Sequence, residues 1–417
     1  MTRSPLRLLR RGLAVVALSH LASATALAQQ PASAPASPAT ATAAPAPAPT
    51  APPAPPPVVA PPPKPSEPPP TPWYQRFELD AFVDAYWSIN YNFPKPDVSA
   101  EVRALDQRNG FSLAWAGVNL GYPAAPVGGT ISLRFGPAAN LIAGPRESGY
   151  GIGFLKQAFV TWKATRRLTF DLGKFDTIIG GEVAESQLNP TYTRGLVFWL
   201  DQPVFHTGLR VGYAFTDTFG ATLLAVNGWN NTVDNNTMKS FGLQLRYAPD
   251  GFSINLTYLG GPEQDETVTT TDAAGAETTK EVDGANRRWR HYVDLTATLA
   301  AGKRVNLILD GDYGVEDMGN DVFHKWGGVA LTGRFAISEI FAAALRGEYH
   351  GDNYLFGSFM QHLVSGTLTL EAAIKKYLLI RFENRLDWAK EAIFKKGLGE
   401  VKNLEVTTLL GMVVKTN

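Results

Sequence analysis

Apolar and polar residues alternate along many short stretches from residue 77 to the end of the chain. In the first stretch, residues 77–93, every odd position is apolar and most even positions are polar. Neighbouring side chains on a β-strand point to opposite faces, so each stretch predicts a strand with one apolar and one polar face. About sixteen strands are predicted, within a range of roughly 14–18. They are residues 77–93, 111–122, 129–136, 154–164, 168–175, 204–215, 219–227, 240–248, 252–260, 290–300, 304–313, 326–336, 340–350, 362–373, 377–388 and 403–415.

The connections between these strands are alternately short and long. Seven are tight turns, such as 165–167, and eight are longer gaps, such as 176–203. Outer-membrane barrels show this asymmetry, with an even number of antiparallel strands, short periplasmic turns and long extracellular loops. A closed barrel also pairs every backbone polar group, as the lipid interior demands. The pattern therefore predicts an all-β fold, a transmembrane antiparallel β-barrel surrounded by the lipid of the bacterial outer membrane.

Aromatic residues at or near the ends of the predicted strands support the membrane assignment. Tyrosine and tryptophan form belts at both interfaces of membrane proteins, where an amphipathic ring meets the headgroups. We expect such belts to contain Tyr91, Tyr122, Trp162, Tyr213, Tyr258, Tyr292, Tyr349, Tyr377 and Trp388.

The chain divides into three segments. Residues 1–28 have the basic start, apolar core and small residues before the cleavage point that are typical of a secretory signal peptide. Residues 29–72 are rich in proline and alanine, and proline lacks the backbone donor that helices and sheets need. Two interpretations of this periplasmic tether remain open, a disordered linker or a spacer that contacts peptidoglycan. Residues 73–417 form the predicted barrel.

Composition narrows the function classes. The 38 basic and 38 acidic residues balance, and removing residues 1–28 takes away four arginines and no acid, which leaves a formal net charge of −4. Because a basic bias is absent, no nucleic-acid partner is expected. The absence of cysteine excludes a disulfide framework. The histidines lie far apart in the sequence and no catalytic or phosphate-binding motif is present, so no metal and no cofactor is expected.

Residues 173–236 contain the segments GKFDTIIGGE, NPTYTRG, QPVFHTGLRVGY and LLAVNGWNNTVDNN. In these segments the chain resembles the OmpL-like family of outer-membrane β-barrel porins, also called beta-barrel porin-2. The resemblance extends over most of the barrel and is specific only in this stretch. It implies a bacterial outer-membrane protein with pore activity and leaves the transported solute open.

The third long gap, residues 176–203, is the best candidate for a functional loop. Barrel porins of about sixteen strands are similar to one another in folding this loop inward to narrow the pore. Here it carries Asp176, Glu182, Glu185 and Arg194. Charged groups that face one another across a narrow aqueous passage set its ion preference. Two roles remain open and can coexist: lining a constriction, or holding the loop to the wall by hydrogen bonds.

Further candidates for the pore lining lie on the polar faces of the strands. A lysine or arginine on the lipid face costs about 2–4 kcal/mol at the midplane, so these charged side chains are expected to point into the lumen. For the one histidine among them, a hydrogen-bonded structural role is the alternative. For the acids of the first strand, the alternative is pairing with the arginines of the fifteenth. The candidates are Asp80, Asp84, His206, Arg210, Arg246, Arg381 and Arg385.

An acidic run between Asp310 and Asp321 has two interpretations. One is a calcium site near the cell surface, and the other is a solvated external loop. The second is favoured because the full helix–loop–helix calcium pattern is missing.

Together these observations predict an outer-membrane porin, a passive, water-filled channel for small hydrophilic solutes or ions that has no enzymatic activity. Barrels of about sixteen to eighteen strands enclose an aqueous lumen. A substrate-specific channel is the nearest alternative. A membrane-embedded hydrolase is less favoured because no Ser–His pair is evident, and a structural or adhesive barrel is the third class. Porins of this size commonly form trimers, so a homotrimer is a further expectation.

Overall fold

The computed structural model describes residues 72–95, 102–103, 109–271, 277–355 and 360–416. The predicted signal peptide, 1–28, and the predicted tether, 29–72, lie outside the described residues except for Pro72. Among the described residues, no helix is long and apolar enough to cross a membrane.

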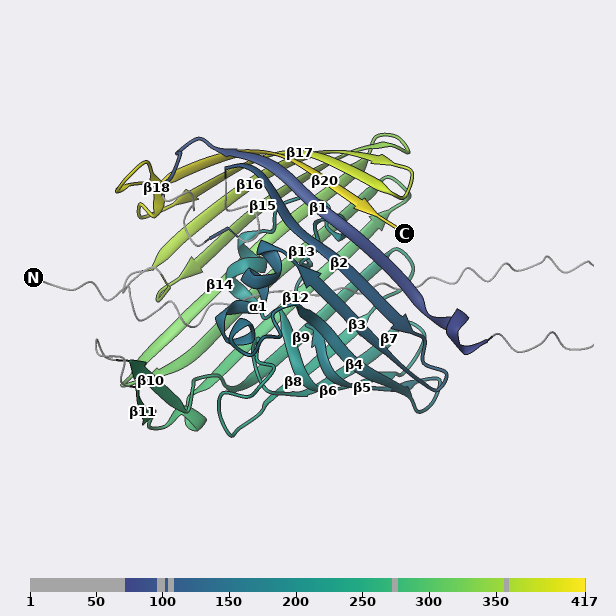
Figure 1. Ribbon diagram of the computed structural model, residues 1–417, viewed down its shortest axis with the longest axis vertical. Helices are drawn as coiled ribbons and strands as arrows, with labels where there is room; N and C mark the ends of the chain where they lie inside the picture. Colours follow the sequence, from purple (N-terminus) through teal and green to yellow (C-terminus); the bar gives the residue numbers. More distant parts are fainter. Residues whose placement is uncertain (1–71, 96–101, 104–108, 272–276, 356–359, 417) are drawn as a thin grey trace, which may run out of the picture. The chain divides into compact units, whose positions relative to one another are not determined.

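Sixteen antiparallel strands form a closed barrel, so the predicted fold and strand number are confirmed (Figure 1). Each strand pairs with its neighbours in sequence order, and β1 pairs with β20 to close the ring. The strands are β1 (Glu78–Asn90), β2 (Gly110–Tyr122), β3 (Val127–Phe135), β4 (Leu155–Lys163), β5 (Leu168–Asp176), β6 (Phe205–Ala214), β7 (Phe219–Val226), β8 (Ser240–Tyr247), β9 (Phe252–Pro262), β12 (Trp289–Ala301), β13 (Val305–Gly319), β14 (Val322–Ala336), β15 (Phe341–Asp352), β16 (Gln361–Ile374), β17 (Leu378–Ala389) and β20 (Leu404–Lys415).

The two faces of each strand differ as the alternation predicts. On β15, Arg346 and Glu348 point inward and are 2% and 5% exposed, whereas Leu345 and Tyr349 point outward and are 55% and 41% exposed. The outer surface is therefore apolar where it meets lipid, and the charged residues are collected in the lumen. This sorting explains why mean hydropathy along the chain stays near zero although the barrel spans a membrane.

The connections also follow the predicted asymmetry, with one exception. The seven periplasmic turns have three or four residues each. On the other side, β13 and β14 are joined by Asn320 and Asp321 alone, with φ angles of 54° and 61°. A two-residue hairpin turn with both φ angles positive favours Asn and Asp, which tolerate the left-handed region. The expected long loop over residues 314–325 was therefore wrong, because both strands continue through it.

Other long connections carry small elements of their own. The loop after β9 holds the hairpin β10 (Thr267–Thr271) and β11 (Glu277–Glu281), and the loop after β17 holds β18 (Phe394–Lys396) and β19 (Glu400–Lys402). These hairpins are separate two-stranded sheets and do not extend the barrel wall.

One aromatic residue departs from the predicted interfacial belts. Tyr292 points into the barrel, is fully buried, and packs at ring-centroid distances of 5.1 Å from Trp229 and 6.5 Å from Trp326. Its assignment to a belt was wrong because it lies on the lumen face of β12, one residue out of phase with the lipid-facing positions. Of the others, Tyr122 is half-buried and the rest are exposed, namely Tyr91, Trp162, Tyr213, Tyr258, Tyr349, Tyr377 and Trp388.

The apolar core lies inside the barrel, where two inserted segments meet. One is the helix α1 (Pro137–Gly149), which is broken at Gly144 by a φ of 75°. The other is the connection between β5 and β6, residues 177–204, called the third loop below. Ile142 of α1, together with Tyr192 and Phe198 of the third loop, belongs to one buried cluster with Trp115 of the wall. The lumen is thus filled in part by the chain's own extracellular loops.

Candidate functional site

The third loop folds into the barrel and packs against its inner wall. It contains the short helices η4 (Ser186–Leu188) and η5 (Val197–Asp201), and η5 contacts β13, β14 and β15. All five side chains of η5 are buried. An apolar segment can lie inside a polar lumen only where it finds apolar partners, and the cluster around Phe198 supplies them.

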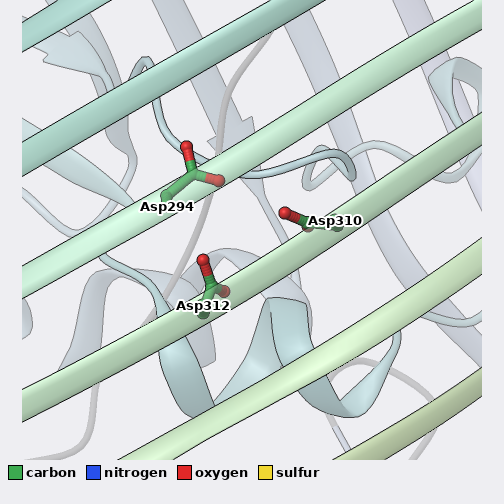
Figure 2. A group of neighbouring side chains, drawn as sticks. All are labelled: Asp294, Asp310 and Asp312. Atoms are coloured by element: carbon green, nitrogen blue, oxygen red, sulfur yellow. The ribbon is translucent and has the colours of Figure 1, made fainter.

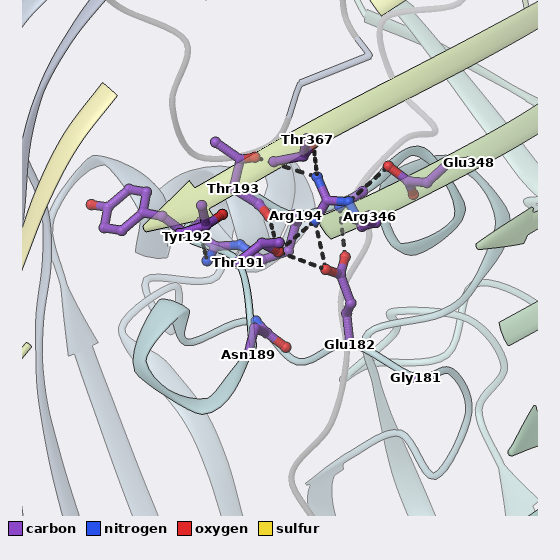
Figure 3. Close-up of polar contacts among 12 residues, drawn as sticks. Gly181, Glu182, Asn189, Thr191, Tyr192, Thr193, Arg194, Arg346, Glu348 and Thr367 are labelled. Atoms are coloured by element: carbon purple, nitrogen blue, oxygen red, sulfur yellow. Dashed lines mark hydrogen bonds and ion pairs between the residues drawn. The ribbon is translucent and has the colours of Figure 1, made fainter. Parts of the chain in front are cut away.

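Arg346 of β15 is the centre of the first anchor of the third loop (Figure 3). Its guanidinium donates hydrogen bonds to Glu182 at 2.6 Å, to the Thr191 hydroxyl at 2.8 Å and to the Thr193 carbonyl at 2.6 Å. It also forms an ion pair with Glu348 on its own strand at 2.9 Å. The side chain is fully buried, so one arginine neutralises two carboxylates that would otherwise lie unpaired in a dry environment.

Arg381 of β17 is the centre of a second anchor. It donates hydrogen bonds to the carbonyls of Ser186, Asn189 and Thr191, the last two at 2.6 and 3.0 Å, and it forms an ion pair with Glu371 at 2.7 Å. One side chain thus donates to three backbone carbonyls of the loop. This is the task that the planar, five-donor guanidinium performs best.

The wall also accepts hydrogen bonds from the third loop. Glu383 of β17 accepts from the backbone N–H groups of Tyr192 at 2.6 Å and Thr193 at 2.9 Å. On β1, Asp84 accepts from the Tyr192 hydroxyl at 2.6 Å and from the Ser186 hydroxyl at 2.6 Å. Donors and acceptors on both partners are matched, which fixes the position of the loop.

Glu185 attaches the third loop to another part of the wall, strands β3 and β4. Its carboxylate lies 2.6 Å from Arg134 of β3 and 2.7 Å from Lys156 of β4, and Lys156 also pairs with Asp176 at 2.7 Å. Burial by itself disfavours the charged form, but Lys156 and Arg134 outweigh it and lower the pKa of Glu185 to about 2. The carboxylate is therefore ionised at any physiological pH.

The structure brings several of the predicted site residues together in these anchors. Glu182, Glu185 and Arg194 are buried and engaged in the loop or with the wall, and Arg194 donates to the Tyr192 carbonyl at 2.6 Å. Arg385 donates to the Arg194 carbonyl at 2.6 Å. These contacts correspond to the second of the two roles that the sequence left open, attachment of the loop to the wall.

The remaining predicted residues lie elsewhere in the lumen. Asp80 accepts a hydrogen bond from Asn119 at 2.8 Å, and Arg210 pairs with Asp171 at 2.9 Å. Arg246 is half-buried on the inward face of β8. His206 contacts the Gly228 carbonyl through Nδ1 at 2.9 Å and the Thr177 hydroxyl through Nε2 at 3.0 Å. Both ring nitrogens of this buried histidine are thus engaged in structural hydrogen bonds.

Sequence reasoning missed the second inserted segment. Glu147 at the end of α1 pairs with Lys174 of β5 at 3.0 Å and accepts from the Thr232 backbone at 3.0 Å. The loop holding α1 lacks the alternation that marks strands, and nothing in its sequence states that it turns inward. The position of Lys174 in the alternation of β5 predicts that its side chain points into the lumen. The sequence does not predict its partner Glu147, which lies 27 residues away.

Three aspartates of the acidic run and its neighbouring strand face the third loop from the wall (Figure 2). Asp294 of β12 lies directly opposite Asp312 of β13, and Asp310 accepts a hydrogen bond from the Gly181 backbone at 2.7 Å. Carboxylate oxygens of the three lie within 4.8 Å of one another, so among the described residues they are a group that could hold a metal ion. Asp310 and Asp312 are therefore buried strand residues, and the expected external loop or surface calcium site was wrong for them.

Two spaces border the third loop. The larger, about 310 Å³, lies between Leu188 and Pro190 of the loop and the periplasmic ends of β13, β14, β16, β17 and β20. The smaller, about 10 Å³, is bordered by Gly181, Glu182 and Glu348. Ile308 of β13 borders both. A space of about 10 Å³ is on the scale of a single water molecule.

A closed sixteen-strand barrel with an apolar outer face and an inward-folded, hydrogen-bonded third loop defines an outer-membrane porin. The chain matches the family model described as "Putative beta-barrel porin-2, OmpL-like" over residues 76–415. It therefore belongs to this family, and it is an outer-membrane diffusion channel of bacteria. No curated protein matches the chain in sequence.

Solved structures of porins share the fold. One is a loop-deletion mutant of OmpT, an outer-membrane protein of Vibrio cholerae, which is 13% identical to this chain with a TM-score of 0.54. The match covers 82% of this chain and 99% of the OmpT chain. The outer-membrane channel DcaP of Acinetobacter baumannii has a TM-score of 0.52 and 11% identity, with 82% and 97% covered. The anion-selective porin of Comamonas acidovorans has a TM-score of 0.50 and 12% identity, with 82% and 99% covered. At these identities the likeness concerns the fold alone.

Proposed function

We propose that the chain conducts small hydrophilic solutes or ions passively, past a constriction formed by the third loop. The observation that carries this proposal is the anchoring of a polar loop across the lumen by buried arginines of β15 and β17. A loop attached at so many points forms a rigid constriction. Ile308 of β13 borders both spaces, and the small volume of the second space, about 10 Å³, favours solutes at the small end of the range.

The residues assigned to the lining under this proposal fall into two groups. The first group is Glu182, Glu185 and Arg194 of the loop together with the wall residues that they contact. These residues hold the loop in place and so shape the constriction. The residues that face the lumen away from the loop set the field along the rest of the path. The assigned residues are Asp80, Asp84, Asp176, Glu182, Glu185, Arg194, His206, Arg210, Arg246, Arg381 and Arg385.

We also propose that the barrel has no catalytic role. His206 supports this, because both of its ring nitrogens are hydrogen-bonded to structural partners. Export by cleavage of residues 1–28, assembly as a homotrimer and contact of residues 29–72 with peptidoglycan are further parts of the proposal. A trimer form is known for OmpT of Vibrio cholerae. Release of the barrel from cell-wall preparations after deletion of residues 31–71 tests the peptidoglycan contact, and chemical cross-linking in the membrane tests the trimer.

Cysteine scanning in planar bilayers tests the conduction path, because the chain contains no native cysteine. Leu188→Cys places a thiol on the loop at the edge of the larger space, where the side chain is 45% exposed. A charged methanethiosulfonate added from the periplasmic side should lower the single-channel current of this variant. Leu345→Cys, on the lipid face, is the matched control and should not respond. A folded barrel that gives no current steps contradicts conduction, and equal responses of the two variants contradict the assigned path.

A further inference from the structure

The larger space beneath the third loop has an unusual set of charges. It opens toward the periplasmic turns, and its volume of about 310 Å³ falls at the lower end of the range for small-molecule sites. Its charged lining residues are Arg334, Arg381, Lys375, Lys376, Lys415 and Glu371. The formal charges of these six side chains leave an excess of four positive charges. We call this space the basic vestibule.

The single acid of the basic vestibule does not balance this excess. Glu371 is buried and is held by Arg381 at 2.7 Å and by Arg334, so its charge is shared between two arginines. The ammonium groups of Lys375, Lys376 and Lys415 have no carboxylate within 4.0 Å among the residues that the structure describes. Lys375 and Lys376 are exposed, in the turn between β16 and β17. Their charge is therefore available to a solute that enters from the periplasmic side.

The acids of the third loop do not oppose this field. Glu182 and Glu185 do not line the basic vestibule, and both are buried in ion pairs with wall residues. Asp84 is likewise buried under hydrogen bonds from Tyr192 and Ser186. A paired and buried carboxylate acts on a distant ion only as part of a dipole, whereas an unpaired lysine facing water acts as a full charge.

We infer that this porin is anion-preferring and that the basic vestibule binds small oxyanions such as phosphate. The inference rests on the proposed function for its transport part, since only a conducting barrel can show ion preference. Rings of arginine and lysine select for anions and phosphate in pores. Lysine binds phosphate as a point charge, and the half-buried Arg334 adds a planar fork of donors. The vestibule therefore concentrates oxyanions on the periplasmic side of the constriction.

Reversal potentials in a KCl gradient at low ionic strength test the ion preference. The current should reverse at a potential that reports several-fold higher permeability for chloride than for potassium. The variant Lys375→Gln/Lys376→Gln/Lys415→Gln should bring this ratio close to one. The matched control Lys163→Gln/Arg166→Gln/Arg167→Gln removes the same charge near another periplasmic turn that does not line the vestibule, and should keep the ratio. Cation preference, or equal ratios in the two triple variants, would overturn the inference while leaving the channel in place.

Phosphate binding to the folded barrel in a zwitterionic detergent tests the site without any need for conduction. Titration of inorganic phosphate, followed by ³¹P line broadening, should show saturable binding that the vestibule variant weakens by about tenfold and the control variant does not change. Saturable binding by a barrel that never conducts would leave the site standing and contradict the proposed channel. The absence of saturable binding to the folded, unmodified barrel would overturn the site.

Discussion

The anchoring of the third loop by Arg346 can be tested by the single substitution Arg346→Met. Methionine keeps the length and part of the volume of the side chain but loses its charge and all donors. Contacts with Glu182, Thr191 and Thr193, at 2.6–2.8 Å, disappear together with the ion pair to Glu348. Two carboxylates then remain buried without the cation they share.

The size of the effect follows from the environment of Arg346. Removing one partner of a buried ion pair costs about 3–5 kcal/mol, because the other charge stays desolvated. If the third loop leaves the wall, the unpaired carboxylates regain water. The substitution therefore destabilises the docked state of the loop and leaves the hydrogen bonds between the barrel strands unchanged. Each 1.4 kcal/mol is about a tenfold change in an equilibrium. The undocked fraction of the loop should therefore rise between about a hundredfold and a few thousandfold.

Single-channel recording is the assay for this change. Arg346→Met should show larger current steps or more open-channel noise than the unmodified barrel, together with faster amide exchange in residues 177–204. Arg304→Met is the control, because it removes an exposed arginine of the turn between β12 and β13 that belongs neither to the anchors nor to the assigned lining. Unchanged conductance, noise and exchange in a folded Arg346→Met barrel would refute the anchoring role.

Three further predictions concern stability. Burial raises the pKa of Glu185, but the charges of Lys156 and Arg134 outweigh it and lower this pKa to about 2. The stabilisation from ionised Glu185 is therefore complete above the ordinary glutamate pKa and is lost as pH falls toward 2, so Glu185→Gln should flatten a profile of melting temperature between about pH 5 and 2. Tyr192→Phe leaves buried Asp84 without its phenolic donor and should lower the free energy of unfolding by about 1–3 kcal/mol in urea titrations, whereas Tyr349→Phe on the outer face should cost less. Leu345→Arg puts a charge on the lipid face and should cost about 2–4 kcal/mol near the midplane in the same titrations, with Leu345→Ala as the control.

The strands of this barrel could be predicted because the membrane imposes a simple rule on them. Lipid on one side and polar lumen on the other force a period of two, so Leu345 and Arg346 are placed by their parity alone. The errors occurred where that rule does not reach. The hairpin at Asn320 and Asp321 was missed because the polar residues around it suggested a loop, although both strands continue up to this turn. Tyr292 was misplaced because aromatic rings also suit a packed lumen.

The site was less accessible from the sequence than the fold. The charged residues of the third loop were identified, but not their partners. Arg346 lies 164 residues from Glu182, and no local pattern couples them. The alternation along a strand predicts which side chains point into the lumen. It does not predict which residues of the inserted loops they contact there. That information is held in the path of the third loop and of α1, which depends on apolar contacts such as those of Ile142 and Phe198.

This distinction decides how charge should be counted in a porin. The net charge of −4 for residues 29–417 would predict a preference for cations. This sum counts every charged residue equally, whether or not a passing ion can interact with it. Glu182, Glu185 and Asp84 are removed from the count that a passing ion senses, because they are buried against donors and cations of the wall. Lys375 and Lys376 remain in that count, because they face water without a carboxylate partner among the described residues. Ion preference is thus a property of the unpaired charges that a passing ion meets, and in the basic vestibule these are positive.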